Sequence, residues 1–183
     1  DKKIIDEVKI IRPDVIFIDP ERLESEEKRA IETIKPDINK ILKIYGDFCK
    51  NICIEMPPRI KLESLKKLGE FEAEYLSYKN KLSRLNLYFG DLKKCEVSAA
   101  DVNGARLEKN ECTIPIKKVI NPLKYLYEPT SAIEVSNTIN ELCFQIKAFI
   151  IEKASDEKVL LSSEILTDSE YVKLTKPYRV LGF

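Results

Sequence analysis

The chain has 183 residues, of which 44% are hydrophobic, enough to bury a core as one domain of ordinary size or as one domain with a small appendage. Its 31 basic residues balance its 31 acidic residues, so the net charge favours neither nucleic acid nor an anionic membrane. It has no histidine, which excludes triads and metal sites that depend on imidazole. No apolar run is long enough to span a membrane, and we expect no membrane partner.

The five cysteines form no CxxC pair and are scattered through apolar segments. We interpret them as buried reduced thiols of a cytoplasmic protein, because a disulfide framework or a zinc site would require paired or regularly spaced cysteines. The sequence therefore predicts no metal site.

The first half of the chain indicates a βαβ unit. Residues 1–12 place apolar side chains at helical spacing, which predicts a short helix or a loop. Residues 15–18 (VIFI) form an unbroken apolar run with a proline on each side, which is typical of a buried parallel strand. Residues 36–46 have one apolar face between a proline and a glycine and predict a helix, and residues 51–56 (NICIEM) predict a second strand.

A short helix is expected next, at residues 62–68, ending at a glycine. Residues 73–78 and 84–90 alternate like two strands joined by a polar turn. Residues 95–108 indicate another hairpin, with Asn103-Gly104 as a tight two-residue turn.

The character of the chain changes after residue 120. Residues 121–129 (NPLKYLYEP) are interpreted as a connector bracketed by prolines. Residues 131–151 are expected to begin as a helix and end as a strand, and two further short strands are expected at 158–166 and 178–183. We therefore predict two domains, 1–120 and 121–183, the second a small α+β domain.

Six segments, taken in order, carry a resemblance to a known family. They are DVIFIDPER, AIETIKPDINKIL, ICIEMPPRI, YLYEPTSAI, LLSSEIL and the terminal YRVLGF. Together they resemble the C-terminal part of class I S-adenosylmethionine-dependent methyltransferases that carry a C-terminal THUMP-like domain. The resemblance implies an α/β fold: the C-terminal half of a Rossmann-like sheet, from its fourth strand onward and ending in an antiparallel strand pair, followed by the small α+β domain.

The cofactor half of such an enzyme has no counterpart in this sequence. The five glycines form no GxGxG loop, the element by which the family binds its cofactor, and the first residue is Asp1. We therefore expect a fragment, or the C-terminal portion of a split protein, that does not bind S-adenosylmethionine by itself. A missing N-terminal half or a second chain is the expected partner.

The acid-proline corner after the first strand is the leading site candidate, because ligands bind beyond the carboxyl ends of strands in open α/β sheets. The resemblance implies that Asp19 accepts a hydrogen bond from a substrate amino group and that Pro20 stiffens the corner. Arg22 stands where the family motif has an aromatic residue, so we expect it to hold a phosphate or a carboxylate rather than to stack on a base. The competing interpretation makes Asp19 a helix cap and Arg22 a partner in a surface ion pair.

The next strand ends at the same edge with Glu55, Pro57 and Arg59, which are expected to line the acceptor pocket. A pair of prolines is more often a rigid turn without any function. Lysine clusters and tyrosines along the chain offer a path for RNA, although such residues commonly form a solvated surface or part of the core.

The resemblance implies methyl transfer to a nucleic-acid base, with RNA as the expected substrate. The alternative is a non-catalytic module, derived from a methyltransferase, that binds RNA or protein. An exposed apolar sheet edge beside residues 15–18, where missing strands would pair, favours the enzyme.

Overall fold

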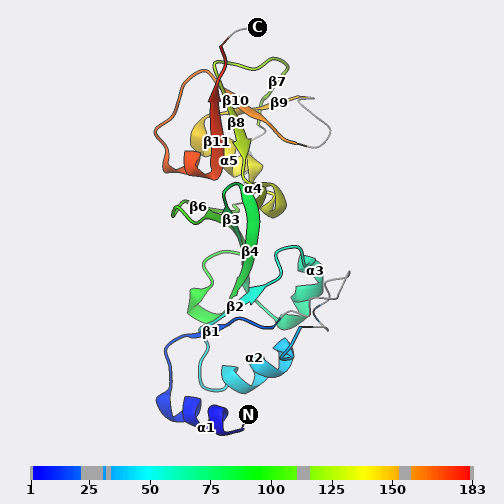
Figure 1. Cartoon of the computed structure of the whole chain (residues 1–183), viewed down its shortest axis with the longest axis vertical. Coiled ribbons are helices and arrows are strands. Elements are labelled where there is room, and N and C mark those ends of the chain that lie inside the picture. Colours follow the sequence, from blue (N-terminus) through cyan, green and yellow to red (C-terminus); the bar gives the residue numbers. More distant parts are fainter. Residues whose placement is uncertain (1, 22–30, 32–33, 111–115, 153–157, 182–183) are drawn as a thin grey trace. The chain divides into compact units, whose positions relative to one another are not determined.

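The computed structural model describes residues 2–21, 31, 34–110, 116–152 and 158–181. The chain forms two compact units, one of residues 1–74 and 84–96 and the other of residues 75–83 and 97–183. Figure 1 shows the elements in chain order. Residues 97–120, which the sequence assigns to the first domain, belong to the second unit, and a domain boundary at residue 121 stays a prediction.

The first unit begins with the βαβ arrangement that the sequence predicts. Helix α1 (Lys2–Ile11) leads into strand β1 (Ile16–Ile18), helix α2 (Ile38–Gly46) follows, and strand β2 (Ile52–Met56) pairs with β1 in parallel. Helix α2 begins at Asp37, whose carboxylate accepts hydrogen bonds from the backbone N–H groups of the second and third residues after it, at 2.9 and 3.3 Å.

An antiparallel hairpin continues the sheet that begins with β1 and β2. After the helical turns α3 (Leu62–Leu65) and η2 (Lys66–Leu68), the chain forms β3 (Glu72–Tyr78) and β4 (Lys81–Tyr88). Strand β4 pairs with β2, and the six-stranded sheet has the order β1-β2-β4-β3-β5-β6, its last two strands being a hairpin described below. A final turn, η3 (Gly90–Leu92), follows β4. The predicted strand pair and the predicted short helix are both confirmed.

Strand β1 differs from its prediction because it is not buried. It lies at the end of the strand order, and Phe17, in its middle, is 60% exposed. The apolar composition indicates a strand with neighbours on both sides, but within the described residues β1 pairs with β2 alone.

The second unit contains the tip of the β3–β4 hairpin and a second hairpin, β5 (Val97–Asp101) and β6 (Arg106–Glu108). Lys79 and Asn80 form the tip of the first, both with positive φ. The second hairpin is confirmed, but its predicted two-residue turn is wrong. Asp101 accepts from the N–H of Gly104 and donates to the carbonyl of Ala105, so three residues form the loop, with the glycine at φ +91°.

A five-stranded sheet forms most of the second unit. Its order is β11-β8-β10-β9-β7. Its bounds are β7 Lys118–Val119, β8 Tyr125–Pro129, β9 Phe149–Ile151, β10 Leu161–Ser163 and β11 Thr175–Arg179. Helices α4 (Ser131–Ser136), α5 (Ile139–Ile146) and η4 (Glu170–Leu174) complete the unit. Two sheets with these helices make the chain a mixed α/β protein.

Three predictions for this part need correction. Residues 121–129 are not a connector, because β8 lies between β10 and β11 in the sheet and Tyr127 is completely buried. The single predicted helix is two helices, separated at Asn137, which has a positive φ. The last strand begins at Thr175, earlier than predicted, because its pairing with β8 starts there.

Four of the five cysteines lie within the described residues. Cys49, Cys53, Cys95 and Cys143 are free thiols and all but Cys95 are buried, whereas Cys112 lies outside the described residues. No helix in the described parts of the chain is long and apolar enough to cross a bilayer.

Candidate functional site

The carboxyl ends of β1 and β2 lie at one edge of the sheet of the first unit. The register pairs Ile18 with Ile54, so Asp19 and Glu55 are the next residues of the two strands. Asp19 is exposed and Pro20 is buried. The backbone N–H of Glu21 donates to the carbonyl of Lys35 at 2.8 Å, which ties the chain after the corner to the segment that enters α2.

The structure brings most of the predicted site residues to this edge. Pro57 is buried and Arg59 is exposed, and both belong to the turn that directly follows β2. Arg22 lies outside the described residues, so its predicted role remains a prediction.

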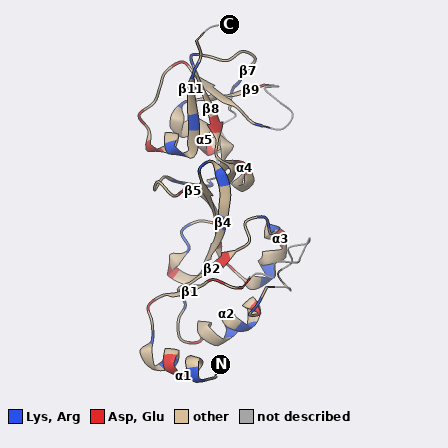
Figure 2. Ribbon diagram, in the orientation of Figure 1, with Lys and Arg blue, Asp and Glu red and all other residues tan. Residues whose placement is uncertain are grey.

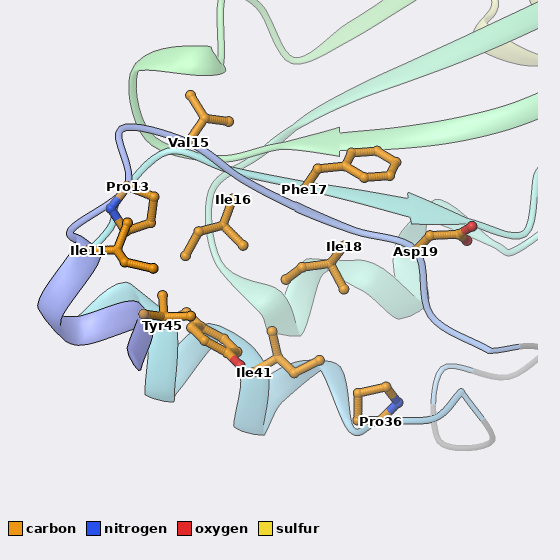
Figure 3. Close-up of a pocket in the computed structure, with 11 residues that line it drawn as sticks. Ile11, Pro13, Val15, Ile16, Phe17, Ile18, Asp19, Pro36, Ile41 and Tyr45 are labelled. Carbon is orange, nitrogen blue, oxygen red and sulfur yellow. The ribbon is translucent and has the colours of Figure 1, made fainter. Parts of the chain in front are cut away.

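Side chains of β1 alternate between two surroundings. Figure 3 shows Ile16 and Ile18 directed toward Ile41 and Tyr45 of α2, whereas Phe17 points to the opposite side. Strand periodicity places Asp19 on the same side as Phe17, and Cys53 and Glu55 of β2 on that side as well. This side of the sheet is therefore polar near the carboxyl ends, while the side facing α2 is apolar.

Buried carboxylates and their partners make up this polar side. Glu55 accepts a hydrogen bond from Arg84 Nη1 of β4 at 2.7 Å, and the Glu55 side chain is 7% exposed while that of Arg84 is 53% exposed. A buried carboxylate requires such a partner, because desolvation otherwise disfavours its charged form. The ion pair therefore holds Glu55 in one orientation beside the candidate corner.

A second carboxylate, that of Glu74 on β3, accepts hydrogen bonds from two polar side chains of β4. Its Oε1 accepts from the hydroxyl of Tyr88 at 2.8 Å and from the amide of Asn86 at 3.3 Å. Burial first, and then the negative charge of Glu74, raise the pKa of Tyr88. Burial likewise raises the pKa of Cys53, which is opposite Tyr88 in the register, to about 11, with smaller contributions from Glu74 and Glu55.

These contacts were not predicted from the sequence. The strand was predicted, and Arg84 and Tyr88 were considered only as part of a surface for RNA, while Asn86 and Glu74 were given no role. The alternation RLNLY at 84–88 was the available signal, because it places arginine, asparagine and tyrosine on one side of β4 and two leucines on the other. Which carboxylates they meet depends on the register, which the alternation does not give.

An apolar groove runs beside the corner in the first unit. Its volume is about 510 Å³. It is lined by residues of α1, β1, α2 and their connections: Val8, Ile11, Pro13, Val15, Ile16, Phe17, Ile18, Asp19, Pro36, Ile41 and Tyr45. Among the lining residues that the structure describes, Asp19 alone has a charged side chain. The groove suits an apolar occupant with a hydrogen-bond donor at the end where Asp19 lies.

The carboxylates of this region can accept hydrogen bonds. Within the described residues, no group of three or more histidine, cysteine, aspartate or glutamate side chains is arranged to hold a metal ion. Asp19 and Glu55 can accept hydrogen bonds from a substrate or orient a cation.

The chain was compared with known proteins. No protein-family model matches it, and a search of curated proteins found no match. The crystal structure of a "putative methyltransferase from Porphyromonas gingivalis W83" is similar, with a TM-score of 0.70 and 20% sequence identity. The match covers 91% of this chain and 44% of that chain. At this identity the likeness concerns the fold, and the chain is similar in fold to a part, less than half, of that protein.

Proposed function

We propose that this chain is the acceptor side of a class I S-adenosylmethionine-dependent methyltransferase that acts on a base in RNA in the cytoplasm. One observation carries the proposal: the exposed carboxylate of Asp19 follows a parallel strand next to the buried Glu55, which is paired with the half-exposed Arg84, in a fold similar to that of a protein described as a methyltransferase. The parallel β1–β2 pair followed by the antiparallel β3–β4 pair supports the Rossmann-like arrangement, and the second unit is proposed to be THUMP-like.

The residues of this chain act on the acceptor. Asp19 accepts a hydrogen bond from the amino group to be methylated and turns its nitrogen lone pair toward the reacting carbon. Pro20 restricts the backbone at the corner, and Glu55, oriented by Arg84, lies one strand away. Direct displacement depends on proximity and alignment more than on a strong base, so the chemistry does not require histidine.

The cofactor, when bound, supplies the methyl group. The apolar lining of the groove suits an adenine, and the carboxylate of Asp19 suits a sulfonium group. The described lining residues include no glycine, and so no backbone donors of a glycine-rich loop. We therefore propose that the cofactor is held mainly by a polypeptide segment other than the described residues.

Local basic residues support an anionic substrate. Figure 2 shows basic residues around α3, in the segment of residues 59–68 that follows β2. The exposed members of this segment are Arg59, Lys61, Lys66 and Lys67. Contacts from such side chains to phosphates would position RNA without reading its sequence.

The test of this proposal is methyl transfer by the complete protein. Transfer of radiolabelled methyl groups from S-adenosylmethionine to RNA is measured for the wild type and for Asp19→Asn, with Asp14→Asn as the control because Asp14 is also exposed and precedes β1. We expect Asp19→Asn to lower the rate by about 100-fold and Asp14→Asn to leave it unchanged. Full activity of Asp19→Asn would remove Asp19 from the site, and an absence of methyl transfer with any RNA would favour the non-catalytic module.

A further inference from the structure

Arg84 carries a guanidinium that the first unit fixes in place without burying it. Its Nη1 donates to Oε2 of the buried Glu55 at 2.7 Å, while the Arg84 side chain itself is half exposed. Within the residues that the structure describes, Glu55 is its one partner. A guanidinium has five N–H donors in one plane, so the carboxylate holds the plane and leaves other donors available. The proposed function uses this arginine only to orient Glu55.

The register places Arg84 at the edge of the sheet where Asp19 lies. Strand β4 runs antiparallel to β2, and Met56, the last residue of β2, pairs with Leu85, so Arg84 lies at the carboxyl end of β2. Its contact with Glu55 puts the guanidinium on the same side of the sheet as Asp19. Neighbouring strands are about 4.8 Å apart, so one to two strand spacings, about 5–10 Å, separate this guanidinium from the carboxylate after β1.

The chemistry of this edge suits an anion next to a hydrogen-bond donor. Asp19 accepts a donor, and the planar fork of Arg84 matches two oxygens of a phosphate or a carboxylate. A guanidinium that is already immobilised loses little side-chain freedom when it binds such a group. Arg59 and Lys61, in the segment after β2, are exposed and add positive charge to the same edge. A chain of phosphates, rather than a single carboxylate, fits this extended positive charge.

We propose that Arg84 binds a phosphate of the RNA nucleotide whose base is held at Asp19. This inference rests on the proposed function for the identity of the ligand and adds a substrate-binding residue to it. One sugar joins the base and the phosphate of a nucleotide, so a single nucleotide spans the two groups. Binding of the phosphate fixes where the amino group of the base lies, and Glu55 keeps the guanidinium in the orientation that meets the phosphate.

The first measurement observes the guanidinium in the wild-type protein, so it needs no substitution that could disturb the fold. NMR spectra of the arginine side-chain N–H groups are recorded while a short single-stranded RNA is added, and separately with sodium acetate at the same ionic strength. We expect RNA to shift the signals of Arg84 and acetate to leave them in place. The signals of Arg106, which pairs with Glu108 in the second unit, should not shift. No shift at Arg84 with RNA, or an equal shift with acetate, would overturn the proposal.

The salt dependence of RNA binding separates a phosphate contact from an ion pair that only stabilises the sheet. Fluorescence anisotropy of a labelled single-stranded RNA gives the affinity at several salt concentrations. We expect Arg84→Gln to weaken binding about tenfold at low salt and to reduce the slope of log affinity against log salt by about 0.7, the value for one phosphate contact on a single strand. An unchanged slope in Arg84→Gln would contradict the phosphate contact.

Two further variants complete this experiment. Arg84→Lys keeps the charge without the planar fork, so it should restore the slope and only part of the affinity. Arg106→Gln is the matched control, because Arg106 is also an arginine paired with a glutamate but belongs to the second unit. Its affinity and slope should equal those of the wild type, and the same losses in Arg106→Gln as in Arg84→Gln would overturn the assignment to Arg84.

Failure of this inference and failure of the proposed function give different results. RNA binding that depends on Arg84 without any methyl transfer would overturn the proposed function and leave the phosphate site in place. Methyl transfer by Arg84→Gln with an unchanged KM for RNA would overturn the phosphate site and leave the proposed function in place.

Discussion

At the scale of single residues, the polar side of the first unit places titratable groups where water is scarce. Burial, together with the negative charges of Glu74 and Glu55, raises the pKa of the Cys53 thiol from 9.0 to about 11. Tyr88 is shifted in the same direction by burial and by its hydrogen bond to Glu74. Neither group is therefore suited to be a nucleophile near neutral pH, and both belong to the scaffold of the site.

The raised pKa of Cys53 predicts a loss of stability in alkali. A group whose pKa is higher in the folded state stabilises the fold below its unfolded pKa, and this contribution disappears as the pH rises from 9.0 to about 11. Across that interval we expect the free energy of unfolding, measured in urea, to fall in the wild type. In Cys53→Ser the fall should be smaller by on the order of 1–2 kcal/mol. An identical pH dependence in the two proteins would contradict this assignment.

Gly90 is the glycine whose replacement should cost the most. Its φ is +66°, and a Cβ there would lie 2.5 Å from the carbonyl oxygen of Lys50 and 2.7 Å from Oδ1 of Asn51. We expect Gly90→Ala to lower the free energy of unfolding by about 2–4 kcal/mol, because both the backbone conformation and the contact are unfavourable.

The matched control for Gly90→Ala is Gly46→Ala. A Cβ at Gly46, which ends α2, would meet nothing within 4 Å, and its φ is not in the left-handed region. Denaturant unfolding should show this variant to be as stable as the wild type or slightly more stable. Equal losses in both variants would mean that the close approach at Gly90 is not what limits substitution.

At the scale of elements, α2 depends on its cap. Asp37 satisfies two backbone donors that the helix itself leaves unpaired. Asp37→Ala should therefore reduce the free energy of unfolding by about 1 kcal/mol, measured in urea. Asp47→Ala, at the other end of the helix, removes an acid from the negative end of the helix dipole and should be neutral or stabilising, so a similar loss there would contradict the capping explanation.

Local patterns predicted most elements of the first unit, because strand and helix periods differ and prolines and glycines punctuate them. The pattern failed at β8, where the prolines suggested a connector. Pro129 is the last residue of β8, where it pairs with Thr175. The exposure of Phe17 was also not predictable from local sequence, because it depends on whether another strand covers β1.

The candidate site, too, was only partly predictable: its strand-end residues were, and its long-range contacts were not. Asp19 and Glu55 follow from strand ends, which the sequence marks with prolines. The Glu55–Arg84 and Glu74–Tyr88 contacts join residues 29 and 14 positions apart in the chain, and they required the register of three strands. Long-range pairing of this kind is not contained in any single segment.

At the scale of the whole molecule, the proposed function assigns the acceptor corner to this chain and the binding of the cofactor mainly to a segment other than the described residues. If this is correct, Asp19→Asn should lower methyl transfer to RNA and leave the binding of S-adenosylmethionine unchanged. Calorimetric titration of S-adenosylmethionine checks the binding, and the RNA assay checks the transfer.

The most direct test is calorimetric titration of S-adenosylmethionine into this chain alone and into its mixture with the polypeptide encoded upstream. The account predicts no binding to the chain alone and one-to-one binding to the mixture. Tight binding to the chain alone, or no binding in either case, would contradict it.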